Sequence, residues 1–126
     1  MNYQQARKYL LSQPEAWEDF PFGPDVAVMK IKGKMFATLV ENNGQASTNL
    51  KCDPDEAVML RDIFSAVIPG YHMNKRHWNT VVLDGDVPKG EIKRMIDRSY
   101  GLVVKNLKKI EREALILRYG KETIFK

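Results

Sequence analysis

The chain has one cysteine, Cys52, only two histidines and no long uninterrupted apolar run. A single cysteine excludes an internal disulfide and any site built from several thiolates, and it suits a reducing compartment. No segment approaches the roughly 18 consecutive apolar residues of a transmembrane helix, and residues 1–8 lack the apolar core of a signal peptide. We therefore expect a cytoplasmic protein with no membrane segment.

What is present suits one ordinary folded domain. The 126 residues are 44% hydrophobic and 29% charged, which is typical of a single domain with its own core, so we expect residues 1–126 to form one unit. The net charge of +4 is unevenly placed: residues 1–104 hold 13 basic and 13 acidic side chains, whereas residues 105–126 hold seven and three. The basic tail either binds phosphate, complements the end of a helix, or faces solvent.

The first half of the chain predicts a short helix followed by an antiparallel meander. Apolar residues recur at helical spacing over residues 3–12, and Pro14 disfavours helix just before it. The proline-rich and aromatic stretch 17–25 favours an extended edge segment and a turn. Strands are expected over 26–31, 35–40 and 46–52, joined by turns at Gly33 and Gly44, because glycine tolerates the positive φ of tight turns.

The second half predicts helices that pack on one face of this sheet. Asp53 as N-cap, Pro54 at the first helical position and Glu56 three residues after the cap mark a helix start, and we expect that helix to run to Pro69-Gly70. A strand over 79–83 and a helix beginning near Pro88 follow. Apolar residues predict one more helix within the C-terminal segment 108–126: Ile110, Ala114, Leu115 and Leu117. The predicted class is α+β.

Aromatic, basic and imidazole side chains are most concentrated in residues 69–78, which contain both histidines, Tyr71, Trp78 and the pair Lys75-Arg76. Basic side chains interleaved with aromatic ones can hold a phosphate backbone and stack on bases. The alternative is that Tyr71 and Trp78 anchor the core while Lys75 and Arg76 face water.

The same side chains give little support for catalysis or metal binding. His72 and His77 are five residues apart with no carboxylate between them, which differs from the i, i+4 pair that aims two imidazoles at one metal. Cys52 precedes a helix start, where a thiol pKa can be lowered, but a small buried apolar role is more common for such a cysteine. We expect no catalytic residue, no metal and no cofactor.

Several sequence blocks together resemble the MmcQ/YjbR family. They are Phe20-Pro-Phe-Gly-Pro-Asp25, Gly33-Lys-Met-Phe-Ala37, Leu50-Lys-Cys-Asp-Pro54, the stretch from Pro69 to Thr80, and Met95-Ile-Asp-Arg-Ser-Tyr100. The resemblance covers about residues 1–107 and leaves the C-terminal segment 108–126 outside. It implies a compact fold with an antiparallel sheet, likened to the double-wing arrangement of DNA-binding domains, and hence a DNA-binding function.

These observations predict a small, non-enzymatic module whose partner is DNA. The expected contact surface joins a basic hairpin to the loop before the last strand: Lys30, Lys32, Lys34, Lys51, Asn74, Lys75, Arg76 and His77. Lys30 and Lys32 are two residues apart on a predicted strand, so they should share one face. Alternating lysines also protect an edge hairpin from aggregation without binding anything.

A second hypothesis is an interaction module for a protein or a small ligand. Its contact surface would be an apolar groove lined by Phe20, Phe22, Tyr71 and Trp78. The two hypotheses differ in their response to salt, because phosphate binding weakens steeply with ionic strength whereas contacts to aromatic side chains do not.

Overall fold

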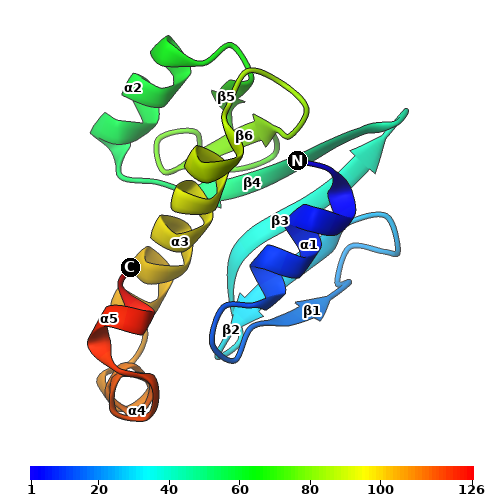
Figure 1. The fold of residues 1–126 in the computed structure, drawn as a ribbon. Coiled ribbons are helices and arrows are strands. Elements are labelled where there is room, and N and C mark those ends of the chain that lie inside the picture. Colours follow the sequence, from blue (N-terminus) through cyan, green and yellow to red (C-terminus); the bar gives the residue numbers. More distant parts are fainter.

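The computed structural model describes residues 1–126. Figure 1 shows the elements, which are in chain order α1 (Tyr3–Leu11), β1 (Trp17–Asp19), β2 (Ala27–Ile31), β3 (Lys34–Asn42), β4 (Gln45–Lys51), α2 (Pro54–Ile63), β5 (Val67–Pro69), β6 (Trp78–Val82), α3 (Lys89–Lys105), α4 (Lys109–Tyr119) and α5 (Lys121–Ile124). None of these helices combines the length and the apolar character that crossing a membrane requires.

The six strands form one antiparallel sheet in the order β1-β2-β3-β4-β6-β5. Four of them are the strands expected from the sequence, with bounds that differ by at most two residues. The other two, β1 and β5, are three-residue strands at the two edges. The predicted α+β class with an antiparallel sheet is confirmed.

The helices cover one face of this sheet. The strand register places Met29 opposite Ala37 and Ala37 opposite Leu50, so these three side chains project to the same face, and each is at most 2% exposed. Helices α1 and α3 lie across this face (Figure 1). Tyr100 of α3 packs edge-on against Phe36 of β3, with ring centroids 5.4 Å apart.

Helix α2 lies over the same face at β6 and begins as the sequence predicts. The Asp53 carboxylate accepts a hydrogen bond from the Asp55 backbone N–H at 3.1 Å, and Pro54 occupies the first helical turn. Asn79 of β6 projects toward the helix and donates from Nδ2 to the backbone oxygen of Ala57 at 3.2 Å. The helix is therefore fixed both at its start and along its length.

The expected end of α2 at Pro69-Gly70 is wrong, because the helix stops at Ile63 and residues 67–69 form β5. The Asp86 carboxylate accepts hydrogen bonds from the backbone N–H groups of Ser65 and Ala66 at 2.9 and 2.8 Å. The Ala66 oxygen accepts one from the Val82 N–H at 2.9 Å. These bonds take the backbone groups that a longer helix would need, and the two N–H groups lower the pKa of the Asp86 carboxyl.

The C-terminal segment 108–126 folds as two helices, where the sequence predicts one. Gly120 separates them with a φ of 87°, a value that favours glycine. Leu115 of α4 and Ile124 of α5 are each 1% exposed and belong to the main core. A Cβ atom at Gly101 of α3 would lie 3.5 Å from the Phe125 ring, so α5 and α3 pack closely. The segment is thus part of the folded body.

Candidate functional site

The topology gathers several predicted site residues at one end of the sheet. Strand β2 runs toward this end and β3 starts there at Lys34, while β4 ends there at Lys51 and β6 starts there at Trp78. The loop 70–77, which joins β5 to β6, lies at the same end. Segments far apart in the sequence therefore meet at adjacent strand ends.

The loop 70–77 is fixed to the sheet through its backbone. The Gly70 N–H donates to Trp78 O at 2.9 Å, and the Cys52 N–H donates to His77 O at 2.8 Å. The Tyr71 N–H donates to the Thr80 hydroxyl oxygen at 2.9 Å. A Cβ atom at Gly70 would lie 2.9 Å from both the Cβ and the backbone oxygen of Trp78, so only glycine fits this approach without a shift.

A pocket of about 390 Å³ lies beside this loop, hereafter the strand-end pocket. Four predicted residues contribute to its wall: Lys51, Asn74, His77 and Trp78. The remaining wall comes from Cys52, Asp53 and Pro54 at the start of α2 and from Leu102 and Asn106 at the end of α3. No sequence signal indicated that the end of α3 reaches this pocket, since the contact depends on how α3 crosses the sheet.

Two lysines of the β2–β3 hairpin are already paired with acids. Lys30 Nζ lies 2.7 Å from an Asp19 carboxylate oxygen, and 5.4 Å from the centroid of the Trp17 ring. Lys32 Nζ lies 2.9 Å from Glu15, and this hydrogen bond lowers the pKa of the Glu15 carboxyl. The prediction that Lys30 and Lys32 share one strand face is wrong, since Lys32 lies in the turn with a φ of 51°.

Four of the predicted basic side chains form no ion pair: Lys34, Lys51, Lys75 and Arg76. All four belong to the sheet end described above, and we call them the basic strand-end surface. Lys34, Lys75 and Arg76 are exposed, and Lys51 is partly exposed beside the pocket. Lys105, at the C-terminal end of α3 between the pocket residues Leu102 and Asn106, is also exposed and unpaired.

The four aromatic side chains of the second hypothesis lie in two separate places. Phe20 and Phe22 follow β1 at one side of the sheet, 45% and 73% exposed. Tyr71 and Trp78 belong to the β5–β6 side, and β2, β3 and β4 lie between. Since neighbouring strands are about 4.8 Å apart, β1 and β6 are separated by roughly 19 Å. The predicted continuous groove of all four is therefore wrong.

The Cys52 thiol is half-buried in the wall of the strand-end pocket. Burial raises its pKa to about 11, and the nearby Glu56 and Asp53 carboxylates act in the same direction. The thiolate that a nucleophilic cysteine needs is thus disfavoured at neutral pH. No group of three or more His, Cys, Asp or Glu side chains is arranged to hold a metal ion.

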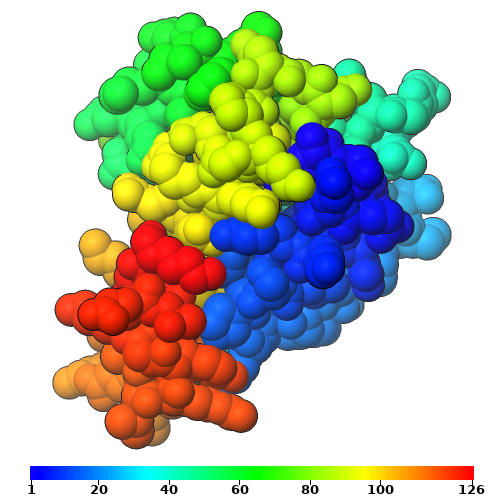
Figure 2. Space-filling view, in the orientation of Figure 1, coloured from blue at the N-terminus to red at the C-terminus, as the bar shows by residue number.

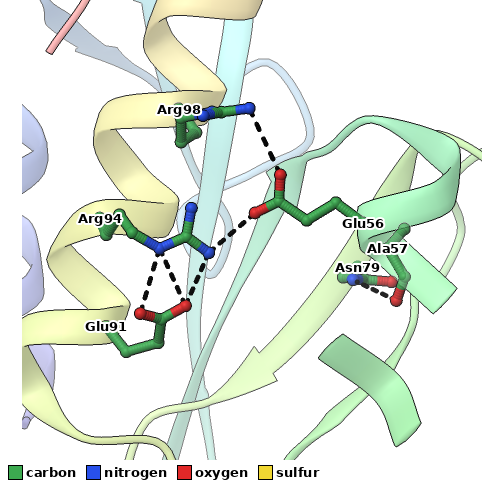
Figure 3. A network of polar contacts seen from close by, with 6 residues as sticks. All are labelled: Glu56, Ala57, Asn79, Glu91, Arg94 and Arg98. Carbon is green, nitrogen blue, oxygen red and sulfur yellow. Dashed lines mark hydrogen bonds and ion pairs between the residues drawn. The ribbon is translucent and has the colours of Figure 1, made fainter. Parts of the chain in front are cut away.

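A second cleft, with a volume of about 660 Å³, lies between α2 and α3, and the sequence did not indicate it. Figure 3 shows Arg94 of α3 between two carboxylates, with Glu91 at 2.6 Å and Glu56 of α2 at 2.8 Å. Arg98, one turn further along, reaches the other oxygen of Glu56 at 3.4 Å. Glu56 therefore joins the two helices and does not complete a capping box with Asp53. The spacing of Glu91 and Arg94 was the one signal available in the sequence.

Comparisons with known proteins identify the family. The family model described as YjbR matches residues 11–102. The chain belongs to the YjbR family. The YjbR protein of Escherichia coli K12 is 31% identical over 116 residues, which cover 92% of this chain and 98% of that protein. The protein YbdF of Escherichia coli O157:H7 is 36% identical over 107 residues, covering 85% of this chain and 88% of YbdF.

Solved structures of similar proteins share the fold. A Deinococcus radiodurans protein with a domain of the family DUF419 superposes with a TM-score of 0.84 at 34% identity, covering 90% of this chain and 87% of that chain. A Pseudomonas syringae protein superposes with a TM-score of 0.72 at 32% identity, covering 81% and 98%. The YjbR family model ends at residue 102, so α4 and α5 lie beyond the matched region.

Proposed function

We propose that this YjbR-family chain is a non-enzymatic binding module that holds the phosphate backbone of DNA on its basic strand-end surface. The observation that carries the proposal is that three segments bring Lys34, Lys51, Lys75 and Arg76 to one end of the sheet without an acidic partner. An unpaired cation can release the counterions of a phosphate, whereas a lysine held by a carboxylate must first give up that contact.

The strand-end pocket supplies groups that suit a nucleotide next to this surface. Trp78 in its wall offers an aromatic face on which a base can stack, and Lys51 lies beside it. Asn74 is less suited to reading a base, because its Oδ1 already accepts the Arg76 backbone N–H at 3.0 Å. A bidentate contact to adenine needs both amide atoms, so Arg76 is left as the side chain able to read a base edge. We therefore expect this chain to bind DNA with only a weak preference for base sequence.

Fluorescence anisotropy with random duplex and single-stranded DNA over a range of salt concentrations tests this proposal. Replacing Lys75 and Arg76 by Ala should reduce the slope of log K against log salt by about 2 on duplex DNA, because each cation neutralises about one phosphate. The matched control replaces Lys89 and Lys93 at the other end of α3, which is 17 residues or about 25 Å long. This control should leave the slope unchanged.

The C-terminal basic residues form a competing site that needs its own variant. Deleting 108–126 would expose the core, because Leu115 and Ile124 are buried, so the better test is the Lys108→Ala/Lys121→Ala double variant, which removes two exposed and unpaired cations. We expect it to bind DNA like the wild type. No binding by the wild type at low salt, or equal loss in the Lys75/Arg76 and Lys89/Lys93 variants, would contradict the proposal. Binding that does not depend on salt would instead favour aromatic contacts.

A further inference from the structure

Lys51 and Trp78 lie side by side in the wall of the strand-end pocket. Their neighbours Leu50 and Asn79 project toward the helices, which cover the face of the sheet seen in Figure 2. The register pairs Lys51 directly with Trp78, so these two side chains share the opposite face. Lys51 forms no ion pair. An aromatic ring beside a free cation suits one nucleotide, because the ring can stack on the base while the cation meets a phosphate.

The other side chains of the pocket determine which part of a nucleotide suits its interior. Leu102 at the end of α3 adds an apolar side chain, and pockets that take in a single base are lined by aromatic and apolar side chains. The Asp53 carboxylate also lines the pocket, where it would repel a phosphate but can accept a hydrogen bond from an N–H group of a base. The other cations of the basic strand-end surface are exposed outside the pocket, namely Lys34, Lys75 and Arg76. The base therefore suits the interior and the phosphates suit the surface outside.

The size of the pocket favours an unpaired nucleotide over a base pair. Its volume of about 390 Å³ lies within the range of about 300–1,000 Å³ that is usual for small-molecule sites, so one nucleotide fits but a double helix does not. In a duplex each base is stacked between its neighbours and paired at its edge, and it enters a pocket only after both contacts are broken. An unpaired base in a single strand does not have to break a base pair.

Tyr71, a second exposed aromatic residue, lies close to Trp78 in the fold. Its side chain is 68% exposed, and its ring lies against that of His72 with the centroids 4.0 Å apart. The Tyr71 N–H donates to the Thr80 hydroxyl oxygen, and the preceding residue, Gly70, donates to the Trp78 backbone oxygen. The backbone that carries this ring is therefore fixed to β6. Proteins that bind single strands stack successive bases on separate aromatic side chains.

We infer that the strand-end pocket takes in one unpaired base, so that the DNA bound by this chain is single-stranded. The inference rests on the proposed binding of the phosphate backbone and adds which form of DNA is held. Contacts to phosphate alone do not produce this preference, because a duplex has the higher density of charge and releases more counterions per contact. A preference for the single strand therefore reports contacts to bases.

Fluorescence anisotropy with the full chain and three labelled probes of equal length tests the inference. The probes are a random single strand, the blunt duplex of the same sequence and an abasic single strand, which keeps the phosphates but has no bases. The random single strand should bind about tenfold tighter than either of the others, because a base stacked on an aromatic side chain contributes a factor of this order.

The three probes also separate this inference from the proposed function. Equal affinity for the single strand and the duplex, or for the random and the abasic strand, would overturn the inference while leaving the binding of the backbone intact. An absence of binding to all three probes at low salt would contradict both.

Trp78→Leu removes the aromatic ring but keeps an apolar side chain in the pocket. It should weaken single-strand binding about tenfold and leave the slope of log K against log salt unchanged, since the phosphate contacts remain. The matched control is Trp17→Leu, which changes the other tryptophan, 46% exposed on β1, and should leave the affinity unchanged. Circular dichroism of both variants checks that the fold is kept. Equal weakening by the two variants would contradict a role for Trp78.

Tryptophan fluorescence detects the contact in a protein whose pocket is intact. Trp78 is the only tryptophan left in Trp17→Phe, and Trp17 is the only one left in Trp78→Phe. Stacking of a base on Trp78 should quench the emission of Trp17→Phe when the random single strand is added, and the emission of Trp78→Phe should not change. Unchanged emission of Trp17→Phe at saturating single strand, or equal quenching by the abasic strand, would overturn the inference.

Discussion

The β2–β3 hairpin and the loop 70–77 are both basic, but the hairpin lysines Lys30 and Lys32 are paired with carboxylates whereas the cations of the loop are not. Lys30 and Lys32 of the hairpin lie against Asp19 and Glu15, which come from the segment before β2. Lys75 and Arg76 of the loop meet no carboxylate, and the loop is held by backbone bonds instead. The difference shows that the number of cations in a segment does not measure the charge that remains available to a ligand.

The two regions also use glycine for different reasons. Gly33 in the hairpin turn has a φ of 78°, and a Cβ atom there would have no neighbour within 4 Å, so its role is conformational. Gly70 has no positive φ, but a Cβ atom there would meet Trp78 and the Cβ of Met73 at 2.9 to 3.0 Å. The hairpin turn thus needs glycine for its positive φ, whereas the loop needs glycine for close packing against Trp78.

The largest expected effect is that of Gly70→Ala. The added methyl group must displace the Trp78 backbone, so we expect a loss of about 3 kcal/mol in the free energy of unfolding. Gly33→Ala should cost only about 1 kcal/mol, since it strains one turn residue in open space. Urea denaturation of both variants measures the difference. If Gly33→Ala were the more destabilising change, the loop would not depend on close packing.

Next in size is the reactivity of Cys52, whose backbone is bonded to the loop. With its pKa raised from 9.0 to about 11, the thiolate fraction at pH 8 should be about 100-fold below that of an unperturbed thiol. Alkylation by iodoacetamide should be slower by a similar factor, and Gly70→Ala should speed it up by loosening the loop. Alkylation at the rate of a free peptide cysteine would show that the pocket does not bury the thiol.

The lysines of the hairpin can be left unpaired, like the cations of the loop, by removing the acids that hold them. In a Glu15→Gln/Asp19→Asn variant, Lys32 and Lys30 lose their partners, so the proposed DNA binding should strengthen about tenfold at low salt and the salt slope should steepen by about 2. The matched control is Glu41→Gln, which removes an exposed acid at the other end of β3. Because the control removes one acid and the variant removes two, a control effect half as large as that of the variant would mean that only net charge matters.

The smallest effect is expected beside the strand-end pocket, at the start of α2. Asp53→Ala removes the side-chain acceptor for the Asp55 N–H, and we expect a loss of about 1 kcal/mol in the free energy of unfolding. Asp53→Asn keeps an acceptor and should lose less. Thermal denaturation of the two variants provides the measurement, and an unchanged stability in Asp53→Ala would argue that solvent caps this helix equally well.

Local signals in the sequence determined the positions of most elements. Segments rich in apolar and β-branched residues predicted β2, β3 and β6, and an alternating pattern predicted β4, each within two residues, while Asp53-Pro54 predicted the start of α2. These signals act between neighbours in the chain, so they are visible without a fold. The early end of α2 could not be predicted from local signals, because Asp86 binds the backbone N–H groups of Ser65 and Ala66, which lie 21 and 20 residues before it in the chain.

The sequence by itself determined which residues are basic, aromatic or able to cap a helix. It also indicated that aromatic, basic and imidazole side chains are concentrated in the loop 70–77. Only the tertiary structure decided which charges remain free, because Glu15 and Asp19 reach Lys32 and Lys30 through strand pairing and packing. It also divided the aromatic side chains between two sides of the sheet and joined the end of α3 to the strand-end pocket. Such arrangements depend on contacts between residues distant in the chain, which spacing and composition do not encode locally.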